Sequence, residues 1–107
     1  MARSILLATL VAGCTASTLT GISAEDLRCP PDSTLTYVNF GAPFLEDNCL
    51  SCHTSKQAPL LTTHSAVLAN KAKILRAAVT SSEMPDDGSL RLEQRRLLGE
   101  WLTCGAP

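Results

Sequence analysis

The chain has 107 residues and a formal net charge of -1, from nine Lys and Arg residues against ten Asp and Glu residues. The length suits one small domain. The charge is balanced and forms no basic stripe, which excludes a typical nucleic-acid-binding protein. With one Trp, one Tyr and two Phe residues, such a domain buries little apolar surface, so we expect a disulfide, a metal or a cofactor to stabilise it.

The N-terminal segment predicts export. Arg3 precedes an apolar run over residues 5–12, which is too short to cross a bilayer as a helix and fits a secretory signal peptide. Residues 11–14, Val-Ala-Gly-Cys, resemble the lipobox of bacterial lipoproteins, in which the chain is cut before the cysteine and the cysteine is lipidated. That resemblance implies a signal peptide over residues 1–13 and a lipid anchor at Cys14, on the periplasmic side of a bacterial membrane. The alternative is cleavage after Ala24, which would leave a soluble periplasmic protein.

Residues 14–28 are rich in Ser and Thr and have no helical period. They predict a flexible tether, or the remainder of a signal peptide. We therefore expect the folded domain to cover residues 29–107. It begins with Cys29-Pro30-Pro31-Asp32, where the prolines favour extended or turn-like backbone.

Three segments predict helices, and no alternating pattern predicts a strand, so the expected fold class is all-α. The first helix opens at Pro43, which suits a first helical turn, and runs into Cys49. The second covers residues 64–80 with a cap at Thr62 or Thr63, and the third covers residues 90–103 and ends at Gly105. The side chains expected to face the core are Phe44, Leu45, Leu68, Ala72, Leu75, Val79, Leu97, Leu98, Trp101 and Leu102.

Residues 49–53, Cys-Leu-Ser-Cys-His, form a C-x-x-C-H motif, which predicts covalent attachment of one c-type haem. Residues three and four apart share a face of a helical turn. The sulfurs of Cys49 and Cys52 can then reach the two vinyl groups along one side of a porphyrin, and His53 can place a ring nitrogen on the iron. Export favours this interpretation, because c-type haem is attached outside the cytoplasm.

Three other interpretations of the C-x-x-C motif remain open. One is a thioredoxin-like redox pair, although the βαβ pattern that accompanies it is missing. Another is half of a zinc site, for which Cys29, Cys104 and His64 are the scattered candidates for the remaining ligands. The third is a disulfide between Cys49 and Cys52.

The expected sixth ligand of the iron is Met84, the only methionine besides the initiator. It lies before Pro85 on an irregular loop between two predicted helices, where a thioether can approach the far face of the haem. The alternatives are a Met84 that only fills space in the core and a bis-His haem ligated by His64. His64 lies only eleven positions after His53, so reaching the opposite face over that span is difficult.

These motifs resemble those of class I c-type cytochromes, over roughly residues 37–107. The attachment motif, Met84-Pro85 and a closing amphipathic helix occur in the order typical of that family. Residues 98–107 also resemble the W-x-x-x-G-A ending of small bacterial cytochrome domains. The resemblance implies a small cytochrome c fold of three to four helices around one covalently bound haem.

The resemblance also implies roles for two further parts of the chain. Pro59 matches a family proline whose carbonyl accepts a hydrogen bond from the proximal histidine, here His53, and fixes its orientation. The first and last helices would cross, with Phe44 or Leu45 against Trp101 and Leu98. The chain departs from the family in the short distance from His53 to Met84 and in Ala58, where glycine is frequent before the proline.

Cys29 and Cys104 lie at the two ends of the predicted domain. In an oxidising compartment they are a natural disulfide pair. Such a bond would close a loop of about 75 residues, worth about 4 kcal/mol in the loop-entropy model. The alternative is two free or partner-linked thiols.

The function that follows is electron transfer with His/Met-ligated haem, between partner redox proteins, without catalysis on a bound substrate. The alternative is a haem-based sensor or gas-binding module with a labile sixth ligand. A peroxidase-like enzyme would need acid–base groups on the distal side, and only Glu83, Asp86 and Asp87 are nearby. The basic residues Lys71, Lys73, Arg76, Arg91, Arg95 and Arg96 are expected on solvated helix faces, or alternatively around a docking site for an acidic redox partner.

Overall fold

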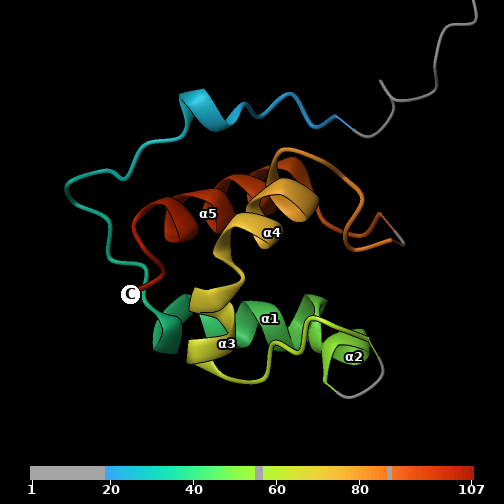
Figure 1. Ribbon diagram of the computed structural model, residues 1–107. Coiled ribbons are helices and arrows are strands. Elements are labelled where there is room, and N and C mark those ends of the chain that lie inside the picture. Colours follow the sequence, from blue (N-terminus) through green and yellow to red (C-terminus); the bar gives the residue numbers. More distant parts are fainter. Residues whose placement is uncertain (1–18, 55–56, 87) are drawn as a thin grey trace, which may run out of the picture.

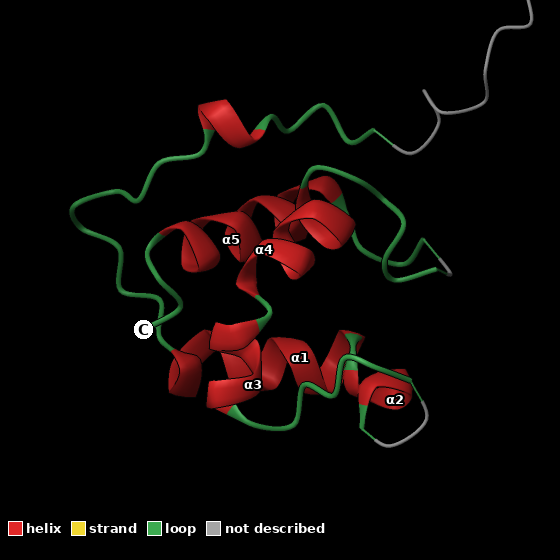
Figure 2. Cartoon of the chain, in the orientation of Figure 1, coloured by secondary structure: helices red, strands yellow, loops and turns green. Residues whose placement is uncertain are grey.

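The computed structural model describes residues 19–54, 57–86 and 88–107, and the predicted signal peptide and Cys14 lie outside these residues. Over the described residues every regular element is a helix, which confirms the all-α class (Figure 2). One isolated bridge pairs Leu19 with Ser81. In this part of the chain no helix has the length and apolar character needed to cross a membrane.

Figure 1 shows the helices in two layers, with α1, α2 and α3 in one and α4 and α5 in the other. The first helical region consists of a π-helical turn, η3 (Tyr37–Gly41), followed by α1 (Ala42–Asn48) and α2 (Leu50–His53). Thr36 and Asn39 form a capping box at its start, and Pro43 lies in the first turn of α1, as predicted. The C-x-x-C-H motif thus lies where α1 gives way to α2.

The predicted helix over residues 64–80 is interrupted. It consists of α3 (His64–Ala69), α4 (Lys71–Ile74) and the π-helical turn η4 (Leu75–Val79). Thr63 caps α3 by accepting from the Ala66 amide at 3.1 Å. The break lies at Asn70, whose φ of -112° and ψ of 12° are not helical. The side-chain amide of Asn70 donates to the carbonyl of Ala66 at 2.7 Å.

The predicted inward stripe of this region is wrong at its start. Leu68 and Ala72 are exposed, and the buried residues are Val67, Ile74, Ala78 and Val79. At the end of the stripe Val79 is buried and Leu75 packs against the core as expected, so the inward residues differ from the prediction only in its first half.

The last helix, α5 (Leu92–Thr103), ends where the sequence predicts. Gly105 follows with a φ of 92°, and the Ala106 amide donates to the carbonyl of Trp101 at 2.8 Å. Leu98, Trp101 and Leu102 are buried as expected, whereas Leu97 is 46% exposed. The expectation of a solvated face is wrong for Arg95, which is 3% exposed.

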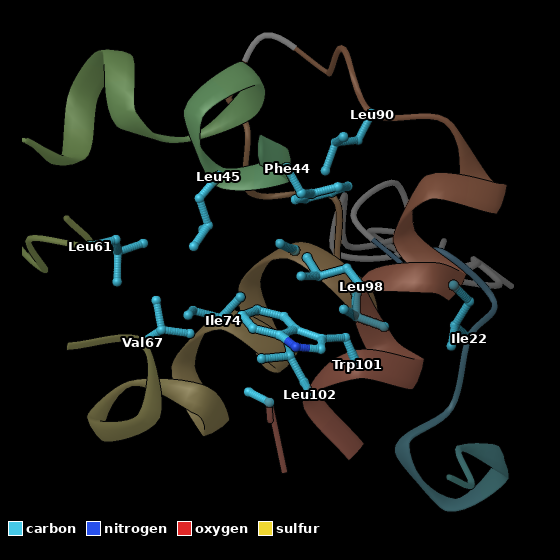
Figure 3. Close-up of a cluster of buried hydrophobic side chains, with 13 residues drawn as sticks. Ile22, Phe44, Leu45, Leu61, Val67, Ile74, Leu90, Leu98, Trp101 and Leu102 are labelled. Atoms are coloured by element: carbon cyan, nitrogen blue, oxygen red, sulfur yellow. The ribbon is translucent and has the colours of Figure 1, made fainter. Parts of the chain in front are cut away.

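Trp101 is the centre of the core between the two layers (Figure 3). Its ring makes a T-shaped contact with the ring of Phe40, with ring centroids 5.9 Å apart. A side chain at Gly41 would collide with it, because an ideal Cβ there would lie 2.5 Å from Cη2 of the indole. Phe44 and Leu45 belong to the same buried cluster, but the ring contacts of Trp101 come from one turn earlier than the sequence suggested.

Residues 19–28, which we call the strap, pack on the helical domain (Figure 1). The hydroxyl of Thr20 donates to the carbonyl of Val79 at 2.6 Å, and its amide donates to the carbonyl of Thr80 at 3.3 Å. Ile22 is 5% exposed within the core cluster, and Leu27 packs against that cluster. A flexible tether over residues 14–28 would not make these contacts, which place residues 19–28 against the helices. A Ser- and Thr-rich composition does not reveal that one isoleucine in the segment is buried.

After the strap, which includes the short 3-10 turn η2 (Ala24–Asp26), Cys29 forms a disulfide with Cys104 at the end of α5. The Cα atoms of the two cysteines lie 4.8 Å apart. This is the pair that the sequence suggested. The bond joins the start of the predicted domain to its last helix, across a sequence separation of 75 residues.

Candidate haem-binding site

The predicted haem-binding residues line one cleft of about 240 Å³ between the two layers. Cys49, Cys52, His53 and Pro59 come from the first helical region and the loop after it, and Met84 comes from the loop between η4 and α5. The apolar side chains of Leu61, Ile74, Ala77 and Ala78 also line it. The structure therefore brings together predicted site residues that lie up to 35 positions apart in the sequence, from Cys49 to Met84.

His53 is held by the loop that follows it. Its Nδ1 atom lies 2.8 Å from the carbonyl oxygen of Pro59 and 3.1 Å from that of Gln57. A carbonyl oxygen only accepts hydrogen bonds, so Nδ1 carries the hydrogen and donates. In the neutral ring this leaves Nε2 with a free lone pair, as a metal ligand requires.

The backbone around His53 supports this arrangement. The amide of Leu61 donates to the carbonyl of His53 at 2.9 Å, and the amide of Gln57 donates to the carbonyl of Cys52 at 3.1 Å. The loop thus folds back on the motif and brings the Pro59 carbonyl to the imidazole.

Cys49 and Cys52 are not joined to each other. Cys52 is exposed, and Cys49 is partly buried at the end of α1. Burial raises the pKa of the Cys49 thiol to about 11. A thiol with a raised pKa is a poor nucleophile at neutral pH, so Cys49 would not be the attacking cysteine of a thioredoxin-like redox pair.

Met84 is held through its backbone on the loop between η4 and α5. Its amide donates to the carbonyl of Ala77 at 2.9 Å, and its carbonyl accepts from Nη1 of Arg95 at 2.7 Å. Met84 lines the cleft and is partly buried against the core cluster.

His64 does not line the cleft. Its ring stacks on Tyr37 at a centroid distance of 4.5 Å and an interplanar angle of 7°. Its Nε2 atom donates to the carbonyl of Ala106 at 2.6 Å. The histidine therefore links the start of α3 to the end of the described chain, and Met84 is the better placed of the two candidate ligands.

No family model, curated protein or solved structure matches this chain. The site therefore has to be interpreted from its own residues.

The donor set of the cleft fits a covalently bound haem. Its lining includes two cysteines, a histidine whose Nδ1 is hydrogen-bonded, a methionine and several apolar residues. A porphyrin provides four nitrogen ligands of its own, so such a site needs only one or two ligands from the protein.

A zinc site fits less well. Among the residues that the structure describes, no three His, Cys, Asp or Glu side chains gather as a metal site. Of the candidate partners for Cys49 and Cys52, Cys29 and Cys104 are bonded to each other and His64 is hydrogen-bonded elsewhere.

Of the acidic residues expected near the sixth ligand, one lines the cleft. Asp86 is exposed at the edge of the cleft and Glu83 is exposed outside the lining, while Asp87 lies outside the described residues.

The residue that the sequence analysis missed is Arg95, because an arginine next to Arg96 on a helix is normally assigned to the surface.

Proposed function

We propose that this protein is a small exported electron carrier of the c-type cytochrome kind, with one covalently bound haem. The observation that carries the proposal is that Cys49, Cys52 and His53 line a single cleft together with Met84. The hydrogen bond from His53 Nδ1 to Pro59 supports it, since it leaves Nε2 available for an iron.

Each of these residues would have its own role in holding the haem. Thioether bonds from Cys49 and Cys52 would hold the cofactor permanently, which suits a domain too small to enclose it. His53 and Met84 would bind the iron. When bound, the haem would supply an iron centre that exchanges one electron, and Met/His ligation would raise its reduction potential. Partner redox proteins would supply and remove that electron.

We further propose that the protein acts outside the cytoplasm. The disulfide between Cys29 and Cys104 supports an oxidising compartment. The strap supports cleavage before Cys14 over cleavage after Ala24, because the later cut would remove Thr20 and Ile22, which are packed against the helices. The lipid anchor at Cys14 would then attach the protein to the membrane.

The maturation site is testable by mass spectrometry of the protein from a bacterial expression host. We expect a lipidated N-terminal peptide beginning at Cys14, and a Cys14→Ser variant that is no longer lipidated. A mature chain that starts at Glu25 would refute this part of the proposal.

The haem proposal is testable by expression with a haem-maturation system. We expect the purified wild type to carry the mass of one haem and a Soret band, and to show a thioether-to-iron charge-transfer band when oxidised. Met84→Ala should keep the haem and lose that band. Leu68→Ala, a change at an exposed residue, should keep both.

Other outcomes would favour other functions. A protein that weighs only its amino acids after proper maturation contradicts the proposal. A wild type with a high-spin, five-coordinate ferrous spectrum would instead indicate a haem-based sensor or gas-binding module.

A further inference from the structure

Arg95 of α5 is the only charged residue that is buried among residues 19–54, 57–86 and 88–107. Its partners are backbone carbonyls. The Nη1 atom donates to the carbonyl of Met84 at 2.7 Å, to that of Ala78 at 2.8 Å and to that of Ser81 at 3.3 Å. One guanidinium nitrogen has two hydrogens, so the contacts with Met84 and Ala78 are its main bonds and Ser81 is a weaker third acceptor.

A buried guanidinium is costly unless its hydrogen bonds compensate for lost water. Core packing alone does not require it, because an apolar side chain of similar length could occupy the same space without that cost. The burial is also sufficient to lower the pKa of Arg95 from its ordinary value. An arginine nonetheless stays protonated near neutral pH.

The three carbonyls show what the guanidinium joins. Ala78 lies in η4, Ser81 lies just after it, and Met84 lies on the loop at the cleft. Arg95 therefore ties the end of η4 and the following loop to α5 at one point. The Met84 amide is already bound to the carbonyl of Ala77, so Arg95 completes the hydrogen bonding of the Met84 peptide groups.

We infer that Arg95 is a positioning residue that holds Met84 at the cleft, keeping its thioether available as an iron ligand. This inference rests on the proposed function. The guanidinium does not contact the cleft, and it acts through the carbonyl of Met84. Without it, the Met84 peptide groups would keep the bond to Ala77 but lose the bond to the guanidinium, and the side chain of Met84 would leave the cleft more often.

The test compares Arg95→Met with Arg96→Met. Both variants remove one positive charge from α5, but Arg96 is exposed. A third variant, Arg95→Lys, keeps a charged donor at the buried position. Hydrogen exchange of the amides in residues 81–86 is the first measurement, and it does not depend on haem ligation.

We expect exchange in residues 81–86 to be at least about tenfold faster in Arg95→Met than in Arg96→Met, because hydrogen bonds to a charged group are lost. Amides in α1 should exchange equally in both. In the haem-loaded protein, added imidazole should displace Met84 at an about tenfold lower concentration in Arg95→Met, since the loop opens more easily. Arg95→Lys should recover part of both effects.

If Arg95→Met and Arg96→Met agree in loop exchange and in imidazole affinity, the inference is wrong. If Arg95→Met does not fold, Arg95→Gln, which keeps an uncharged donor, decides by the same two measurements. A wild type without haem contradicts the proposed function, whereas the exchange comparison would still measure whether Arg95 holds the loop.

Discussion

Ile22 offers the sharpest test of whether the strap belongs to the folded domain. Its side chain is 5% exposed, and changing it to alanine removes three carbon atoms from the core. At about 0.8 kcal/mol per buried carbon group, the transfer contribution is about 2.4 kcal/mol. The residual cavity adds little here, because the strap lies at the edge of the domain and can move inward.

We therefore expect Ile22→Ala to lower the free energy of unfolding by about 2.5 kcal/mol. For a domain of this size each kcal/mol shifts the melting temperature by about 4–8 °C, which predicts a decrease of about 10–20 °C. The assay is thermal unfolding of the mature protein with its disulfide intact, followed by circular dichroism. Leu19→Ala is the matched control, since Leu19 lies in the same strap and is 71% exposed.

The control should melt close to the wild type. Equal melting temperatures for Ile22→Ala and Leu19→Ala would mean that the strap does not unfold together with the helices. The structural argument against cleavage after Ala24 would then be lost.

Gly41→Ala should destabilise the domain by about 1–3 kcal/mol in the same assay, because the new methyl group would press on the buried indole of α5; an unchanged melting temperature would contradict this close approach. Replacing both Cys29 and Cys104 by alanine should cost about 4 kcal/mol of stability, measured by urea unfolding, given the loop of 75 residues; a loss under 1 kcal/mol would show that the loop-entropy estimate does not hold here. In the haem-free chain at pH 8, iodoacetamide should modify Cys52 well before Cys49. A thiol with a pKa of about 11 is only about one part in a thousand ionised at that pH, and its thiolate increases as the pH rises toward 11. Equal rates at pH 8 would refute the burial of Cys49.

The features that the sequence predicted best are local ones. Pro43 at a helix start, Thr63 as a cap and Gly105 after the last helix each act through the backbone of a few neighbouring residues. The C-x-x-C-H motif was enough to identify Cys49 as a candidate, and a position before Pro85 on a predicted loop was enough to identify Met84. That both residues line one cleft depends on tertiary packing.

The features that sequence reasoning missed depend on residues far apart in the chain. The choice between Val67 and Leu68 as the inward residue is made by the packing of the second helical region and by the break at Asn70. Burial of Ile22 depends on the strap reaching η4. Arg95 is the strongest case, because the three carbonyls that compensate its charge exist only once the loop is folded.

The bond between Cys29 and Cys104 turns residues 29–104 into a covalent ring. Both walls of the cleft lie inside this ring, and the strap lies outside it. If the strap detached or were lost to proteolysis, the residues that line the cleft would still be joined to each other both along the chain and through the disulfide. Even in the unfolded chain the ring limits how far the wall of His53 can separate from that of Met84, so the conformational search that rebuilds the cleft is shorter than in an open chain.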